Sequence, residues 1–250
     1  MVILTLLEKS YGKEKTDLFV YKGLTSITSG LKIQLKHIGK TERGWTKIEI
    51  VGEDEKILIN YLKKNFGLAP IQLKDVHASM IFKGKIIDSG KVGYGLYIDI
   101  GITTPQPIDA LIPLYKLRSQ LSNNKRVSVH KIIKDFCLYT NFPLEITLTK
   151  VDLNRKIIEA ELSDKQLKVF RDWLLLGLDR VVALGATIHH IKRAVYKSKL
   201  YRDVINITPL GLLEQVLVCK LGTDAPGIIT KIGPYLAAVP LHAFSPNRIK

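Results

Sequence analysis

Between residues 79 and 163, five short apolar segments alternate with turns, and this spacing limits the fold of the chain more than any other feature. Several short strands separated by frequent turn residues are typical of a small closed barrel. The strands are expected at Met80–Ile87, Tyr94–Ile100, Asp109–Pro113, Leu144–Val151 and Lys156–Leu162.

A helix is expected between the third and fourth of these strands, in the sequence VSVHKIIKDFCLY. Its apolar residues have helical spacing, and a helix at this place in a five-stranded barrel is the OB-fold arrangement. The inner wall of a short barrel favours aliphatic side chains, which leaves Tyr94 and Tyr97 as candidates for an outer stacking surface. The expected inner residues are Ile86, Leu96, Ile98 and Ile100.

Glycines flank Tyr94 in the sequence GYGLYIDIG. Because glycine has no Cβ, it lets a strand bend sharply and approach a neighbour or a ligand. Exposed tyrosine rings stack on nucleic-acid bases with a gain of roughly 1 to 3 kcal/mol per base, largely irrespective of sequence. The stretch therefore predicts a surface for single-stranded nucleic acid.

Residues 79–163 resemble an S1 domain, the RNA-binding version of the OB-fold. The resemblance is carried by FKGKIIDSGKVGYGLYIDIG, by DALIPLYKL and by LEITLTKVDLNRKIIEAELS. It implies that Tyr94 and Tyr97 stack on bases, and that Asp152 and Lys156 contact RNA near the last turn. Lys85 and Arg155 complete the candidate set on the barrel. A barrel that retains this fold but binds protein in place of RNA is the alternative, because Pro113 stands where many S1 domains have a histidine.

Residues 1–78 are expected to form a separate α+β unit of ferredoxin-like βαββαβ order, ending near Ala69 and Pro70. Its strands are expected at Val2–Leu7, Leu31–Ile38 and Trp45–Val51, with a short helix near 23–30. The sequence GEDEKILINYLKKNFGL has acids in its first turn, lysines in its last turn and a glycine at its end, which predicts a second helix. Its buried face is expected to hold Ile57, Leu58, Tyr61 and Leu62.

Residues 164–250 are expected to form a long helix, a basic helix and a small α+β unit. Ser163 followed by Gln166 is a capping-box pattern. A long apolar stripe predicts that the helix then continues to about Gly185. The stripe consists of Leu167, Phe170, Leu174, Leu178 and Val181. Strands are expected in DVINI, EQVLVCKLG and VPLHAF, and a helix in TDAPGIITKIG.

The chain has 38 Lys and Arg residues against 23 Asp and Glu residues, a formal charge of +15. Such an excess attracts polyanions, and RNA is the expected partner: ribosomal or transfer RNA or a nascent transcript, with the ribosome or RNA polymerase as the machine involved. Between Asp179 and Asp203 no acid occurs. A basic helix in this gap predicts a phosphate-binding face made of Lys192, Arg193, Tyr196, Lys197, Lys199 and Arg202. The alternative is a solvated surface helix.

A second alternative is an amino-acid-binding regulatory protein. The strand, the TDAPG turn and the following helix resemble the start of an ACT domain, which implies a ligand at Thr223, Asp224 and Gly227. Helix capping by Thr223 or Asp224 explains the same residues.

Catalytic motifs, metal-ligand spacings and cofactor fingerprints are absent from the sequence, so we expect neither enzymatic activity nor a metal or cofactor. The two cysteines, Cys137 and Cys219, lie far apart in apolar runs, which fits a reducing cytoplasm. No apolar stretch reaches the roughly 18 residues of a membrane span, and the oligomeric state is open.

Over its full length the chain also resembles an archaeal family without an assigned activity, which combines an S1-like centre with the block CKLGTDAPGIITKIG and LHAFSP. The expected fold class is thus α+β and multidomain, with an S1-like OB barrel between two α+β units at 1–78 and 164–250. The expected function is a non-enzymatic RNA-binding role in archaeal translation or transcription.

Overall fold

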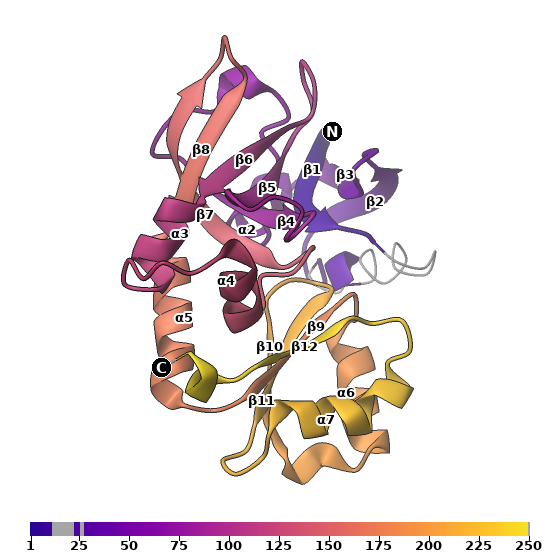
Figure 1. Cartoon of the computed structure of the whole chain (residues 1–250). Helices are drawn as coiled ribbons and strands as arrows, with labels where there is room; N and C mark the ends of the chain where they lie inside the picture. Colours follow the sequence, from indigo (N-terminus) through magenta and orange to yellow (C-terminus); the bar gives the residue numbers. More distant parts are fainter. Residues whose placement is uncertain (12–22, 26–27, 250) are drawn as a thin grey trace.

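The computed structural model describes residues 1–11, 23–25 and 28–249 and shows an α+β protein in three parts (Figure 1). A three-stranded sheet, a closed five-stranded barrel and a four-stranded sheet follow one another along the chain. No helix in these ranges is long and apolar enough to cross a membrane. Short 3-10 helices lie at Leu73–Asp75, Leu200–Arg202, Gly233–Tyr235 and Pro246–Arg248.

The N-terminal sheet contains the three predicted strands, antiparallel in the order β1-β3-β2. They are β1 (Val2–Lys9), β2 (Ile33–Lys40) and β3 (Trp45–Gly52). Of the predicted short helix, residues 23–25 are helical, and 26–27 lie outside the described residues. The strand expected to close the unit is reduced to one antiparallel bridge between Leu6 and Leu68.

Helix α2 (Glu55–Asn65) packs on this sheet through Leu58 and Leu62. The prediction that Ile57 and Tyr61 share the buried face is wrong, because their side chains are 58% and 44% exposed. The sheet covers only a narrow stripe of the helix, so the flanking apolar residues remain in solvent.

The predicted barrel is confirmed as a closed sheet in the order β4-β5-β6-β8-β7. All neighbouring pairs are antiparallel except β6 and β8. The expected inner residues Ile86, Leu96, Ile98 and Ile100 are fully buried. The strands are β4 (Ile81–Ile87), β5 (Gly95–Ile102), β6 (Ile108–Pro113), β7 (Pro143–Asp152) and β8 (Ile157–Leu162).

Two helices lie between β6 and β7. The predicted one, α4 (Val129–Phe136), is capped by Ser128 and buries its apolar stripe. The other, α3 (Leu114–Leu121), is missed by the sequence analysis, because the alternation of DALIP ends at Pro113 and the next eight residues are too few to show a helical period.

Helix α5 (Asp164–Leu176) begins as predicted, since the Ser163 side chain accepts a hydrogen bond from the Gln166 N–H. It ends nine residues earlier than expected. Gly177 adopts the left-handed conformation (φ 64°) that terminates helices. Leu178 and Val181 therefore do not continue the apolar stripe of the helix, which corrects the prediction of a helix to Gly185.

The residues after Gly177 form β9 (Arg180–Leu184), the strand that the sequence analysis missed. The C-terminal unit has the complete order β9-α6-β10-β11-α7-β12, and its antiparallel sheet runs β10-β11-β9-β12. Its other elements are α6 (Ile188–Lys197), β10 (Val204–Pro209), β11 (Glu214–Cys219), α7 (Ala225–Ile232) and β12 (Leu241–Phe244).

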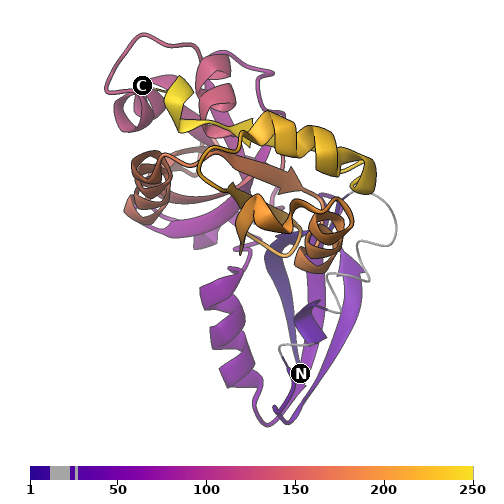
Figure 2. The ribbon, with the colours of Figure 1, turned by 90° about the horizontal axis from the view of Figure 1, so that it is seen from below.

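Both faces of the central strand β9 are covered, whereas the edge strand β10 is largely exposed. Val181 and Ala183 point to the core beneath α6 and α7, the helices seen on one side of the sheet in Figure 2. Val182 and Leu184 belong to the core that continues into the barrel and α5. Apolar packing therefore contributes to the contact between this sheet and the barrel.

A buried group of charges joins the three parts. Lys85 of β4 is 1% exposed, and its Nζ lies 2.5 Å from Glu214 Oε2 of β11 and 3.5 Å from Glu8 Oε2 of β1. The Tyr11 hydroxyl donates to Glu214 Oε1 at 2.7 Å, and the Leu212 N–H donates to Glu8. Lys85 thus does not face the outer surface, which corrects its place among the predicted RNA-binding residues.

Because two carboxylates share one lysine at this junction, the stability of the junction depends on pH. The pKa of Glu8 is raised to about 7, because the effect of burial, opposed by Lys85 and reinforced by Glu214, prevails. A raised pKa means that the folded state holds the proton more tightly than the unfolded chain. The contribution of Glu8 to stability is then fully present below about pH 4.5 and is lost as the pH rises to about 7.

We therefore expect Glu8→Gln to change the pH profile of stability. The free energy of unfolding of the native chain should fall relative to that of the variant between pH 4.5 and 7 by at most about 3 kcal/mol, because one pKa unit corresponds to about 1.4 kcal/mol. Chemical denaturation at half-unit pH steps measures this difference. A difference that stays constant across the window contradicts the prediction.

Candidate nucleic-acid interface

Tyr94 and Tyr97 lie on the outside of the barrel, at the start of β5. Tyr94 is 56% exposed, and Tyr97 is half-buried. The two hydroxyl groups are hydrogen bonded at 2.9 Å, and the rings meet edge to face at a centroid distance of 6.2 Å. The pair presents two differently oriented aromatic faces to solvent.

Gly95, between them, explains why glycine is needed in this stretch. A Cβ on Gly95 would collide with the Ile112 carbonyl oxygen and the Leu111 side chain on β6. Beside the glycine, the connection from β4 to β5 borders an open cavity of about 300 Å³ whose wall includes Asp88, Lys91, Tyr97 and Asp109. Lys91 is ion paired with Asp88 at 3.0 Å, so this cavity offers aromatic and apolar surface but no unpaired cation.

The predicted RNA contacts at the last turn of the barrel lie apart from the tyrosines. Tyr97 pairs with Leu111, and Leu111 pairs with Glu159 of β8. Lys156 precedes Glu159 by three residues, which places it about 10 Å farther along the barrel and two strands away. The structure thus puts these residues on neighbouring parts of the barrel and does not join them in one pocket.

Asp152 and Lys156 have local partners in the β7–β8 hairpin. The Asp152 carboxylate accepts the Arg155 N–H at 2.8 Å and thereby shapes the turn. Lys156 has φ 56°, and its Nζ donates to Gln106 Oε1 at 3.3 Å. Arg155 is exposed, and its side chain has no ion-pair partner among the described residues.

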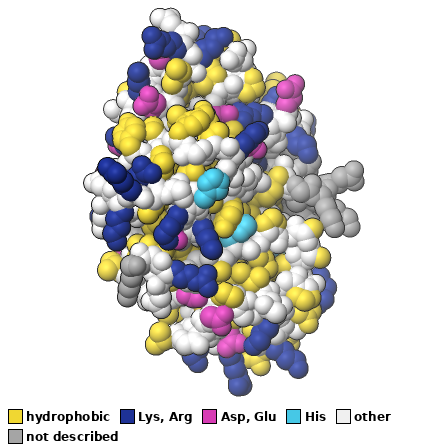
Figure 3. All heavy atoms as spheres, viewed as in Figure 1, with side chains coloured by type: hydrophobic (Ala, Val, Ile, Leu, Met, Phe, Trp, Pro, Cys, Tyr) yellow, Lys and Arg dark blue, Asp and Glu magenta, His cyan; other side chains and the backbone are white. Residues whose placement is uncertain are grey.

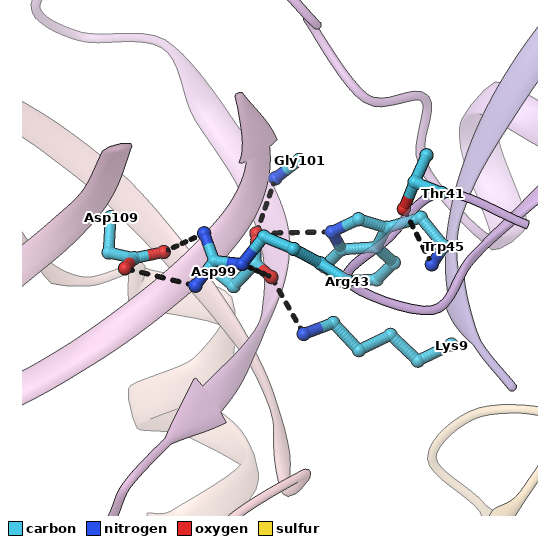
Figure 4. A network of polar contacts seen from close by, with 7 residues as sticks. All are labelled: Lys9, Thr41, Arg43, Trp45, Asp99, Gly101 and Asp109. Carbon is cyan, nitrogen blue, oxygen red and sulfur yellow. Dashed lines mark hydrogen bonds and ion pairs between the residues drawn. The ribbon is translucent and has the colours of Figure 1, made fainter. Parts of the chain in front are cut away.

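The N-terminal unit covers the barrel face near the tyrosines, through a network around Asp99 (Figure 4). Lys9 Nζ lies 2.6 Å from the fully buried Asp99 carboxylate, which also accepts the Trp45 indole N–H and the Gly101 N–H. Arg43 contacts Asp99 through Nε at 3.2 Å. Its two terminal nitrogens bind Asp109 at 2.7 and 3.1 Å.

Burial sets the electrostatics of this network. It lowers the pKa of Lys9, while Asp99 opposes the shift. It raises the pKa of Asp109, against the effect of Arg43. Without Arg43, the buried Asp109 carboxylate would lose the cation that favours its ionised form.

The predicted basic face of α6 is exposed. Ile191, Ala194 and Val195 point into the protein, as expected from their spacing. The basic side chains carry no ion pair to any described residue. Tyr196 is 76% exposed, and the Arg202 guanidinium lies 5.9 Å from the Tyr201 ring. The helix ends earlier than expected, so the exposed set consists of Lys192, Arg193, Tyr196 and Lys197 on α6 and of Lys199 and Arg202 in the segment after it.

This helix lies at the lower end of the molecule, opposite the end that carries the β8 hairpin (Figure 1). On the face drawn in Figure 3, Lys and Arg side chains occur at the lower end and also along the barrel side. The tyrosine pair and the α6 face are thus separate surfaces.

At the C-terminal turn, the amide groups that would bind an amino acid have partners within the chain. Asp224 Oδ2 accepts the Gly227 N–H at 2.8 Å and caps α7. The Ala225 N–H donates to Asp179, and the Thr223 N–H donates to the Lys220 carbonyl. The residues predicted as an alternative ligand site therefore act as a helix cap in this structure.

Sequence reasoning missed Lys9, Arg43, Trp45, Asp99 and Asp109. One signal was present: Asp99 stands in an apolar strand, and a buried carboxylate requires a partner. The partners are not readable from the sequence, because Trp45 and Asp99 are 54 residues apart.

Two family models match the chain. The DUF2110 central domain matches residues 76–174, and the DUF2110 C-terminal domain matches residues 178–243. The gap between the matches falls at the end of α5, where Gly177 stops the helix. No curated protein matches the chain.

We predict that Arg43→Lys raises the pKa of Asp109 and costs about 1.5 to 3 kcal/mol of unfolding free energy, because a single ammonium cannot serve both Asp99 and Asp109. Carboxyl-carbon NMR titration reads the pKa of Asp109, and denaturation reads the stability. The control is Arg193→Lys, at an exposed arginine of α6, which should change neither quantity. An unchanged pKa of Asp109 would mean that Arg43 does not stabilise its ionised form.

Proposed function

The chain belongs to the DUF2110 family, and for this member we propose a non-enzymatic role in binding single-stranded RNA. The observation that carries the proposal is the outward-facing Tyr94–Tyr97 pair at the start of β5, beside a cavity of about 300 Å³. Aromatic rings on this part of a five-stranded barrel are the usual stacking platform for bases. We propose that bases stack there and that the cavity accepts one of them.

Phosphate contact in this proposal comes mainly from α6. The cavity beside the tyrosines has only an ion-paired lysine, whereas the cations of α6 are exposed and have no acidic partners among the described residues. Arg155 and Lys156 on the barrel hairpin supply a smaller contribution. An RNA that uses both surfaces must extend from the barrel to the C-terminal unit.

The fold types that we propose for the barrel and for the N-terminal unit support the same role. The barrel order with α4 between β6 and β7 is consistent with an S1-like OB-fold, and we propose that identity for residues 79–163. We also propose a ferredoxin-like N-terminal unit, because Leu68 pairs beside β1 where the fourth strand of such a sheet belongs. Archaeal translation or transcription, in the cytoplasm, is the proposed setting.

A protein-binding barrel is the second candidate, and one observation favours it. The Asp99 network shows that part of the barrel face already serves as a contact surface for another unit of the same chain. RNA binding is preferred because the tyrosines remain outside this contact.

We expect Tyr94→Ala/Tyr97→Ala to weaken binding of a single-stranded RNA by roughly 1 to 3 kcal/mol per stacked base. Fluorescence anisotropy with a labelled oligonucleotide measures the affinity. The melting temperature should change little, because both rings lie outside the barrel core.

The matched control is Tyr61→Ala/Tyr235→Ala, which removes two exposed rings from other parts of the surface. Equal RNA affinity in the test and control variants would exclude the tyrosine pair as a stacking platform.

Reversal of charge on α6 tests the phosphate contacts. In Lys192→Glu/Arg193→Glu/Lys197→Glu, the slope of log affinity against log salt should flatten by about two units, because each phosphate contact to a single strand contributes about −0.7. All RNA sequences should weaken alike, since phosphates carry no sequence information.

Lys56→Glu/Lys63→Glu/Lys64→Glu on α2 gives the same change in net charge on another exposed helix. If both triple variants flatten the slope equally, the effect comes from net charge and not from a site on α6.

A further inference from the structure

A second cavity, of about 390 Å³, lies where α3, α4, α5 and the C-terminal 3-10 helix meet. Figures 1 and 2 both show the C-terminal segment returning beside the helices that follow β6. The wall of this cavity contains no residue of the tyrosine pair or of α6. A volume of this size is in the range of small-molecule sites in proteins.

The rim of this cavity is basic. Lys125, Lys131, Arg171 and Arg248 line it, against one carboxylate, Asp135. Asp135 is paired with Lys131 at 2.9 Å. The other three cations have no ion-pair partner among the described residues.

Elsewhere on α5 the exposed lysines are paired. Lys165 binds Glu145, and Lys168 binds Asp172, both at 3.0 Å. Arg171, on the cavity side of the same helix, is the one left without a carboxylate among the described side chains. A guanidinium presents planar paired donors that match a phosphate group.

The floor of the cavity is apolar, and two phenylalanine rings lie behind it. Phe136 of α4 and Phe170 of α5 are buried there, and their rings pack at a centroid distance of 5.3 Å. Leu167 and Leu174 extend this surface along α5. A ligand that fills the cavity therefore needs a flat or apolar part as well as an anionic end.

Neutral polar groups complete the wall. Ser122 and Asn123, in the turn after α3, have side chains without a hydrogen-bond partner among the described residues. Such groups are suited to the polar edges of a ligand.

We propose that this cavity is a nucleoside phosphate site, in which Arg171 and Arg248 bind the phosphate and the apolar floor supports the base. The same chemistry is present in a free nucleotide and in the 5′-terminal nucleotide of an RNA. The site is separate from the tyrosine pair, so it adds a second binding function to the one proposed above.

The experiment measures binding of AMP, adenosine and inorganic phosphate to the full chain by titration calorimetry. AMP should bind more tightly than either fragment, because only AMP reaches both the cations and the floor. Arg171→Glu/Arg248→Glu should reduce the affinity for AMP by about tenfold or more, as expected for loss of charged phosphate contacts. Lys168→Glu, on the outer side of α5, should leave the affinity within about twofold.

A second arm compares two RNA oligonucleotides of one sequence, with a 5′-phosphate or a 5′-hydroxyl. A preference for the 5′-phosphate that is lost in Arg171→Glu/Arg248→Glu assigns the site to RNA ends, and binding of AMP without this preference assigns it to free nucleotides. The proposal is overturned if neither AMP nor the 5′-phosphorylated RNA depends on Arg171 and Arg248, or if inorganic phosphate binds as tightly as AMP. Tyr94→Ala/Tyr97→Ala should not change AMP binding, which separates this result from the fate of the proposed barrel function.

Discussion

The contact of Lys85 with Glu8 and Glu214 is the interaction on which the arrangement of the three parts depends. Each of the three residues comes from a different sheet, and none is more than 4% exposed. An ion removed from water has a large desolvation cost, which only close partners of opposite charge offset. The three sheets must therefore meet in one geometry, since separating any of them leaves a buried charge without its partner. Apolar packing alone is less directional.

The Asp99 network applies the same constraint to the barrel surface. Asp99 lies in β5, two residues after Tyr97 of the same strand, and it binds Lys9 and Arg43 from the N-terminal unit. This unit thus covers part of the barrel face and leaves the start of β5 open. The stacking surface that remains is smaller than that of an isolated barrel. The buried ion pair of Lys9 with Asp99 holds the N-terminal unit beside it.

The three candidate binding surfaces differ in chemistry. The tyrosine pair offers aromatic faces, the α6 face offers exposed cations, and the cavity beside α5 combines an apolar floor with a basic rim. A lysine that is already paired with a carboxylate adds little to the affinity of the stacking surface for RNA. Exposed cations bind phosphates but do not distinguish one base from another. Separate surfaces of this kind suit an extended polyanion, because a chain of nucleotides can contact them at different points.

The sequence by itself determined the features that depend on neighbouring residues. Alternating aliphatic residues specify the barrel strands, and Ser128, Ser163 and Asp224 cap the helices that they precede. These signals are local, because a strand's inner face and a helix's first turn are set within a few residues. The outward position of Tyr97 followed from the same alternation, because Leu96 and Ile98 point inward.

Only the tertiary structure decided the features that depend on distant partners. The segment Arg180–Leu184 forms a central strand covered on both faces, so it shows neither a period of two nor a helical period, and the preceding helix pattern extended into it. Lys85 looks like a surface cation in the sequence, yet it is buried against Glu8, 77 residues earlier. A charged side chain is buried only where the fold brings it a partner. Long-range packing decides which residue that partner is.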